Sequence, residues 1–594
     1  MINLKFTSIL CLFLLLGFIS AHSQVTHGPI LGKPSDKSMG IWVRTALPGS
    51  VTVNYGLYSD SMTETIVFET KIEKDCSGWA CFNNLSPNTV YYYRIRTSGS
   101  AKEIQRTFKT LPSGKDYYNE AYNKGGLFNF SFHLGHCSNQ KMHDFSKGDI
   151  STFQIMNNQW KEKVNFGILN GDFIYEDARD TPVDVWQYSV GLKSNEIPDI
   201  VSVAPSVVGV WQNYKNYLDR SENLSKWHSY VPTFFTMDDH EVLGDFYGSG
   251  EIGRKDKKAL FRDIGTQAWL DYIGWGNPYI TNQNITFGKC QLKKGTSFLK
   301  DENVDFTKIN LNETSNLHIH WGDSKEGAQN AGVYEINEVI DKNTLRISPS
   351  PIATENCSYS IGRQLYGKFS LGNCDFYFLD TKSNRPMHDT KNPSKSGLSM
   401  LGKIQYNWLL EEMKNSKADF HFVISTVSFM IPHTGTHGKI GVPDKDDSWT
   451  AFLWEREKLL NFFDGLGKKV FILTGDVHNS YSIKITDNVW EFMGGPLSSR
   501  NHLSSHLDNI PPTGDVNLNG RPFNIRWSSY FLPDIPSKKL HFPIFCIVQI
   551  NNVFNNPIVD NTDRWVKYPN PQVVFQFYSG ITGELLYAES VTKE

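Results

Sequence analysis

The segment FGILNGDFIY, residues 166–175, decides the fold. Its four apolar residues stop at Asn170-Gly171, and the polar side chains of Asp172 and Tyr175 follow at once. A short apolar run that ends in turn residues is typical of a strand buried on both faces. Similar runs recur at 128–134, 233–237, 376–379, 421–426 and 469–474, and helical patterns occupy 401–414 and 449–466. Strands alternating with helices predict an α/β layered domain with functional groups at the carboxyl ends of its strands.

Four of these strands end in residues that can bind metals. The residues that follow them are Cys137, Asp172 with Tyr175, Asp239 with His240, and Asp476 with His478. Taken singly, each has a structural explanation, and Cys137 alone would be read as a small buried hydrophobe. Since four such motifs follow four predicted strands in chain order, we expect four neighbouring strands to present them at one edge of a sheet.

So many acidic and ligating groups would repel one another unless cations lay between them. Carboxylates can bridge two cations, thiolate, phenolate and imidazole favour ferric iron or zinc, and oxygen ligands suit calcium or magnesium. Two cations about 3.5–4 Å apart can hold a hydroxide and neutralise the oxygens of a phosphoryl group during in-line displacement. Phosphoryl transfer to water is therefore the predicted reaction class.

Three motifs also resemble a known family. Segments 171–176 (GDFIYE), 238–242 (DDHEV) and 473–478 (LTGDVH) closely resemble signatures of the alkaline phosphatase D (PhoD-like) metallophosphatases. Segment 379–382 (LDTK) with Arg385 resembles the family's Leu-Asp-Thr-Arg strand end. Gln405 and Asp447 lie in stretches that resemble its two connecting helices.

The resemblance implies an extracytoplasmic hydrolase of phosphate esters that uses a metal-bound hydroxide. It implies one iron (Fe3+) and calcium ions as cofactors, with zinc, manganese or magnesium as alternatives, and the four-layered fold of the calcineurin-like and purple acid phosphatases. The metal ligands that it implies are Cys137, Asp172, Tyr175, Asp239, Asp476 and His478. Asp172 would bridge the metals, and His240, the second catalytic residue, would contact the phosphate.

The chain departs from the family pattern at one further candidate ligand. Asp245 lies where the family usually has an Asn, and it is a possible metal ligand. Arg385 is a possible phosphate-binding residue, as is Arg179, and a surface or core ion pair is the alternative for each. His433 and His437 could line the pocket, although a solvated loop is the favoured interpretation.

The rest of the chain divides into recognisable segments. Residues 1–23 resemble a signal peptide, because Lys5 precedes an apolar run and small residues precede Gln24. Short β runs over 24–112 predict a fibronectin type III-like β-sandwich, 113–126 a linker, and 127–594 the metallophosphatase domain. Residues 281–361 contain β-like pieces with few helical signals, which indicates a β-rich insertion.

Composition narrows the function classes. A formal charge of −3 with 39% hydrophobic residues excludes wholesale disorder, a fibre or a multi-spanning membrane protein. It also gives no basic field for non-specific nucleic-acid binding, and no nucleic-acid-binding module is evident. We expect no transmembrane segment after cleavage, because the leader's apolar run is shorter than a spanning helix.

Cysteine usage leaves the pairing open. Cleavage would remove Cys11 and leave seven cysteines, an odd number for disulfide pairing within one chain. Cys76 and Cys81 could bridge locally or stay reduced. The family resemblance makes Cys137 the unpaired cysteine.

The main hypothesis is a secreted, periplasmic or cell-surface phosphomonoesterase or phosphodiesterase, whose substrate could also be a phospholipid or a teichoic-acid-like diester. The alternative is an extracytoplasmic glycan- or partner-binding protein with a structural or degenerate metal site.

Overall fold

The computed structural model describes most of the chain. The described residues are 24–97, 103–139, 151–193, 195–320, 328–387, 392–434, 447–503, 507–530, 541–557 and 563–594. The predicted signal peptide, Cys11 and His437 lie outside them. Among these residues, no helix has the length and apolar character needed to cross a membrane.

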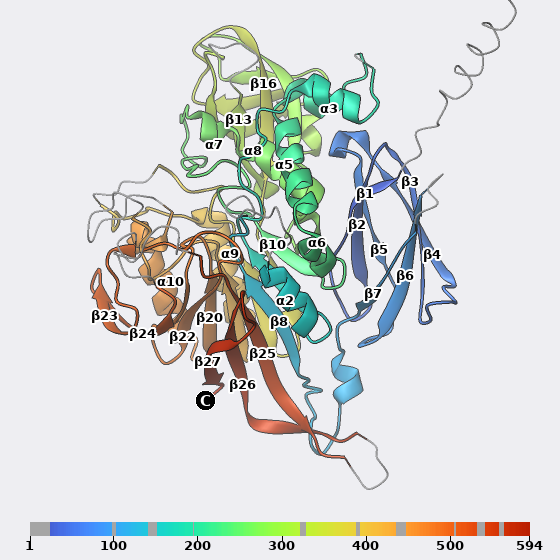
Figure 1. Ribbon diagram of the computed structural model, residues 1–594. Helices are drawn as coiled ribbons and strands as arrows, with labels where there is room; N and C mark the ends of the chain where they lie inside the picture. The colour runs from blue at the N-terminus through green and yellow to red at the C-terminus, as the bar shows by residue number, and fades with distance from the viewer. Residues whose placement is uncertain are drawn as a thin grey trace, which may run out of the picture.

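Two large sheets face each other at the centre of the molecule (Figure 1). The first has the order β10-β9-β8-β25-β26-β27 and the second the order β17-β18-β19-β20-β22-β21-β24-β23. The strands of the first sheet are β8 (Phe130–Gly135), β9 (Phe166–Asn170), β10 (Thr233–Thr236), β25 (Ile544–Asn555), β26 (Trp565–Ser579) and β27 (Leu585–Thr592). Those of the second are β17 (Gly367–Leu371), β18 (Cys374–Phe378), β19 (Phe420–Ile424), β20 (Lys469–Thr474), β21 (Ser480–Lys484), β22 (Val489–Gly494), β23 (Gly514–Leu518) and β24 (Arg521–Ser528).

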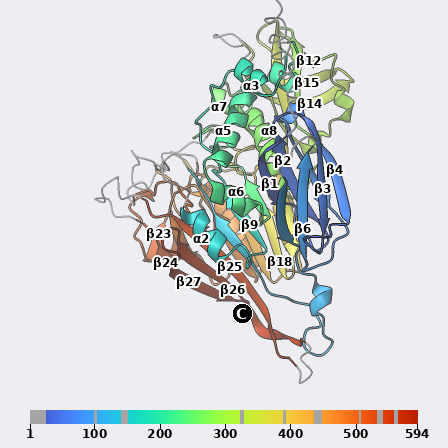
Figure 2. The same ribbon diagram turned by 45° about the vertical axis from the view of Figure 1, so that its right-hand side comes forward.

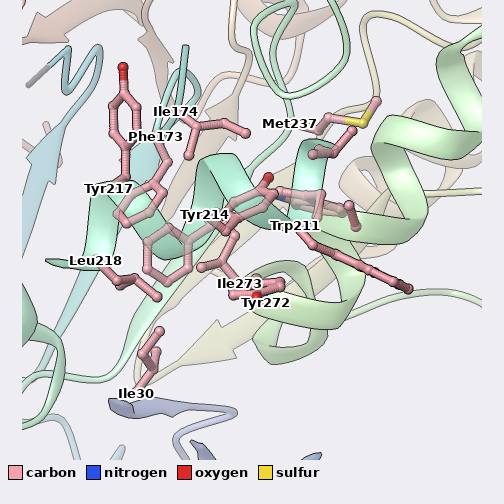
Figure 3. Close-up of a cluster of buried hydrophobic side chains, with 14 of the residues drawn as sticks. Ile30, Phe173, Ile174, Trp211, Tyr214, Tyr217, Leu218, Met237, Tyr272 and Ile273 are labelled. Atoms are coloured by element: carbon pink, nitrogen blue, oxygen red, sulfur yellow. The ribbon is translucent and has the colours of Figure 1, made fainter. Parts of the chain in front are cut away.

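Helices cover the outer face of each sheet, so the domain has four layers. The first sheet is covered by α2 (Ser151–Gln159), α5 (Val207–Asp219), α6 (Glu222–His228) and α8 (Arg262–Tyr272), and the second by α9 (Gly402–Asn415) and α10 (Leu453–Gly465). The remaining described α-helices are α3 (Val183–Ser189), α4 (Asp199–Val203) and α7 (Lys257–Leu260). A phenylalanine-rich core lies between the sheets, with Phe132 edge-on to Phe376 and Phe422. The aromatic cluster under the first helical layer includes Trp211, Tyr214 and Tyr272 (Figure 3).

The expected arrangement of the four site-bearing strands is wrong in one respect. Strands β8, β9 and β10 are parallel neighbours in the first sheet, but β20 belongs to the second. Asn170 joins the two sheets at this edge, because its Nδ2 donates to the carbonyls of Ser425 and Leu473 and its Oδ1 accepts from Thr236. The site is therefore assembled where two sheets meet.

A smaller β-sandwich packs along the first helical layer (Figure 2). Its sheets have the orders β1-β2-β5 and β4-β3-β6-β7. The strands are β1 (Val25–Gly32), β2 (Met39–Thr45), β3 (Gly49–Gly56), β4 (Glu64–Thr70), β5 (Ser77–Phe82), β6 (Val90–Thr97) and β7 (Ile104–Lys109). Its assignment to the fibronectin type III class stays a prediction.

A buried carboxylate, Asp75, anchors the sandwich to the helices. It forms ion pairs with Arg44 of β2 at 3.0 Å and Lys215 of α5 at 3.2 Å, and it accepts a hydrogen bond from Trp186 Nε1. Burial opposes its ionised form, but the two cations outweigh burial and lower the pKa of Asp75 to about 2. The sandwich is thus docked by a fully buried ionic contact.

All seven cysteines among the described residues are free thiols, and distance argues against a local Cys76–Cys81 disulfide. Cys76 lies just before β5, and the strand carries Cys81 away from it. At about 3.3 Å per residue, the Cα atoms of Ser77 and Cys81 are roughly 13 Å apart. Cys76 lies only about 3.8 Å from Ser77, so the Cys76 and Cys81 Cα atoms are at least roughly 9 Å apart. A disulfide allows at most about 7 Å between Cα atoms.

The predicted β-rich insertion contains a closed barrel of order β11-β12-β15-β14-β13-β16. Its strands are β11 (Thr286–Leu292), β12 (Phe298–Lys300), β13 (Thr314–Ile319), β14 (Gly332–Asp341), β15 (Thr344–Ser348) and β16 (Glu355–Arg363). The barrel has its own hydrophobic core. It holds the loop after β10 through a hydrogen bond from Gly253 N to Val333 O and one from Asn316 Nδ2 to Ser249 O.

Candidate metal centre

Sharp turns after the strands direct the predicted ligands into one site. Cys137, Asp172, Asp476 and His478 all have positive φ angles, between 47° and 71°. This conformation is costly for residues other than glycine and persists where the surrounding structure enforces it, often at functional sites. Buried Glu241 enforces one of these turns, because its carboxylate accepts hydrogen bonds from the backbone N–H groups of Asp172, Phe173 and Asp238.

One side of the site is built from four different ligand types. Cys137 Sγ lies 3.3 Å from Asp172 Oδ2, and the Tyr175 hydroxyl lies 3.2 Å from the same oxygen. The Tyr175 hydroxyl is also 3.2 Å from His478 Nε2, and Ser499 lies 2.9 Å away. Cys137, Asp172 and His478 can each direct a ligand atom within 4.8 Å of the others. Thiolate, imidazole and carboxylate together suit a transition metal.

The other side of the site is rich in carboxylates. Asp172, Asp238, Asp239 and Asp476 form one group, and Asp172, Asp239 and His240 form another, each with ligand atoms within 4.8 Å. Asp172 belongs to three of the four groups of possible metal ligands among the described residues, as a bridging ligand would. Its Oδ1 is buried and has no hydrogen-bond partner among the described residues. An orphaned carboxylate oxygen among acidic neighbours fits a hard cation such as calcium.

The electrostatics of the protein alone favour the protonated forms of Cys137 and Asp172. Burial, the carboxylates around it and a hydrogen bond to Asp172 raise the pKa of the Cys137 thiol well above its usual range. Burial and nearby Asp238, Asp239 and Glu241 also raise the pKa of Asp172. Because metal ligands must be deprotonated, cations would reverse both shifts. Together with these shifts, the donor types fit a transition metal on the thiolate side and a hard cation such as calcium on the carboxylate side.

The predicted catalytic histidine is oriented by a carboxylate. His240 Nδ1 lies 2.8 Å from Glu176 Oε2, and the imidazole is about a quarter exposed. Burial opposes its charged form, but Asp239, Asp172 and Glu176 raise the pKa of His240 well above its usual range. Glu176 thus orients the His240 imidazole, and the surrounding carboxylates favour its charged form.

Arg385, a possible phosphate-binding residue, forms a buried ion pair in the structure. Its side chain is fully buried, with Nη1 2.7 Å from Asp447 and Nη2 donating to the Phe246 carbonyl. Lys382 is also fully buried, and its Nζ lies 2.5 Å from both Asp238 and Asp447. These two cations therefore serve as internal counter-charges behind the carboxylates. Arg179 is half-buried and donates to the His240 carbonyl.

Two ligand candidates outside the strand-end motifs also reach the site. Asp245 joins Asp239 and Asp447 in a further acidic group, and its side chain is exposed. His433 is 2% exposed, and its Nδ1 lies 2.9 Å from Asp476 Oδ2, so the favoured solvated-loop interpretation is wrong for this residue. Asp447 and Asp238 were not predicted as site residues, although Asp238 adjoins Asp239 in a quoted motif.

Comparisons with known proteins agree with this architecture. The model of the PhoD-like phosphatase family matches residues 132–287 and 349–530, more than half of the chain, and omits most of the barrel. Alkaline phosphatase D of Bacillus subtilis (strain 168) is 22% identical over 491 residues, which cover 77% of this chain and 65% of that protein. The chain thus spans about two thirds of the length of this relative.

Two solved structures resemble this chain to different degrees. A structure of PhoD superposes with a TM-score of 0.55 at 17% identity and covers 96% of this chain and 94% of that one. A dimetal phosphatase from Danio rerio matches with a TM-score of 0.32 at 9% identity, covering 78% of this chain and 99% of that one, which is too low to inform the fold.

The layered fold agrees with that of PhoD, and the family model matches more than half of the chain. The chain belongs to the PhoD-like phosphatase family, as its sequence motifs indicated.

Proposed function

We propose that the chain is an exported, metal-dependent hydrolase of phosphate mono- or diesters. The observation that supports this most strongly is the convergence of the five other predicted ligands, from both sheets, around the carboxylate of Asp172. Export is proposed from the leader-like sequence of residues 1–23.

The donor types suggest which cations bind. Cys137, Tyr175 and His478, with Asp172, would hold a transition metal such as ferric iron or zinc. Asp239 and Asp476 with Asp172, and Asp245 at the exposed edge, would hold calcium, or magnesium or manganese. Bound cations of this kind activate water and neutralise charge on phosphate oxygens.

His240 supplies the proton chemistry of the protein. With Nδ1 held by Glu176, the imidazolium is placed to stabilise negative charge on the phosphate or to give a proton to the leaving oxygen. Lys382 and Arg385 act indirectly, by fixing the carboxylates behind the site.

Hydrolysis of a chromogenic monoester and a diester, with chelator and with added calcium or zinc, tests the proposal. We expect activity that the chelator abolishes and metal restores. His240→Asn should reduce kcat by about 10²–10⁴-fold while metal content is unchanged. Asp60→Asn, an exposed change in the sandwich, is the control and should keep full activity. Full activity in the metal-free protein, or in His240→Asn, would refute the proposal.

A further inference from the structure

The inserted barrel places two cysteines opposite each other. Cys290 of β11 and Cys357 of β16 are direct partners in the antiparallel register. Directly opposed residues have Cα atoms about 4.5–5.5 Å apart, which falls within the about 4.4–6.8 Å range of disulfides. Cys81, Cys374 and Cys546 are paired with other residue types in the described strand pairs.

Both side chains project into the same interior. Cys290 is 1% exposed and Cys357 is 5% exposed, and both belong to the barrel's hydrophobic core. A hydrogen bond between the two thiols, together with burial, raises the pKa of Cys290. The two sulfur atoms are therefore neighbours in the barrel interior, and the buried carboxylate of Asp301 also acts to raise the pKa of Cys290.

We propose that Cys290 and Cys357 form a structural disulfide that closes the barrel during maturation in an oxidising compartment. The thiolate of Cys290 attacks a disulfide of the oxidant, a protein or small-molecule disulfide, and expels one thiol. The thiolate of Cys357 then attacks the Cys290 sulfur of the mixed disulfide and expels the second thiol. Two protein thiols lose two protons and two electrons, and the oxidant is reduced to two thiols.

The Cys290–Cys357 disulfide would form while the barrel folds, before its interior closes. In the folded barrel both sulfurs are buried and the Cys290 thiol is held protonated, so attack on an external disulfide is slow. Once formed, the bond is shielded from reductants for the same reason. The disulfide would enclose β12 to β15 within its loop and restrict the unfolded chain. This inference does not depend on the hydrolase activity.

Peptide mapping of the exported full chain tests the proposal. The protein is denatured in an alkylating reagent without reductant and then digested. We expect one cross-linked peptide pair that contains Cys290 and Cys357, with Cys76, Cys137 and Cys374 alkylated. The full chain refolded with oxidised glutathione should give the same pair, and this arm remains informative if export fails. Complete alkylation of Cys290 and Cys357 in both preparations would overturn the proposal.

Thermal unfolding with and without reductant provides a second readout. Reductant should lower the midpoint of the wild type and of the control Cys374→Ala by the same amount. It should not move the midpoint of the double variant Cys290→Ala/Cys357→Ala. An equal shift in the double variant would contradict the proposal, whatever the stability of that variant.

Discussion

Replacing Lys382 with Met tests whether an internal cation stabilises the carboxylate cluster. The Lys382 ammonium is fully buried and lies 2.5 Å from Asp238 and 2.5 Å from Asp447. Methionine is unbranched and of similar length, so the substitution removes mainly the charge. Asp447 keeps its contact with Arg385, but Asp238 loses its ion pair with Lys382 in a site where burial already disfavours its ionised form.

The expected cost follows from breaking a buried ion pair. Removing one partner leaves an uncompensated charge and typically costs about 3–5 kcal/mol. The ratio of folded to unfolded protein should therefore fall by roughly 10²-fold or more, because each 1.4 kcal/mol is about a tenfold change. Burial and the neighbouring carboxylates already raise the pKa of Asp238, and losing Lys382 raises it further. Since a raised pKa favours folding at low pH, the deficit should shrink as the pH falls.

Urea unfolding of the metal-free protein measures the effect, monitored by fluorescence at several pH values. Lys403→Met, an exposed change on α9, is the matched control and should be nearly neutral. A loss below about 1 kcal/mol in Lys382→Met, or a deficit that does not change with pH, would refute the assigned role of this cation.

Two further predictions concern the sandwich and the transition-metal site. Because the pKa of Asp75 is lowered to about 2 from an ordinary 3.8, its ionised form contributes about 2 kcal/mol above pH 4, and this is lost as the pH falls through 2. In urea unfolding, the free energy of unfolding of Asp75→Asn should therefore be lower than that of the wild type by about that amount at pH 7, and the two values should converge in acid. The same difference in free energy at pH 2 as at pH 7 would contradict this. Cys137→Ser removes the thiolate, so elemental analysis should show bound iron or zinc falling at least about tenfold while calcium is retained; wild-type iron or zinc would contradict the ligand assignment.

The strand-end motifs could be predicted because they are local. The apolar run before Gly171 and the polar residues after it lie within ten residues, and strand direction alone places them at a sheet edge. Which sheet each strand joins is a long-range property. The position of β20 in the second sheet was therefore mispredicted, although its ligands still reach the same edge.

The supporting residues of the site could not be predicted for the same reason. Asp447 and Lys382 meet across 65 positions of sequence, and His433 meets Asp476 across 43. Contacts between residues this far apart leave no periodic pattern in the sequence from which they could be predicted. The sequence left two roles open for Arg385, phosphate binding or an ion pair, and its full burial beside Asp447 agrees with the ion pair.

The measurement that tests the central claim most directly is elemental analysis of the purified wild type and Asp172→Asn, each desalted and folded. Asp172 is shared by the thiolate side and the carboxylate side of the site. We expect the wild type to hold a transition metal and calcium, and the variant to lose both together. A variant that retains both metals at wild-type occupancy would contradict this expectation.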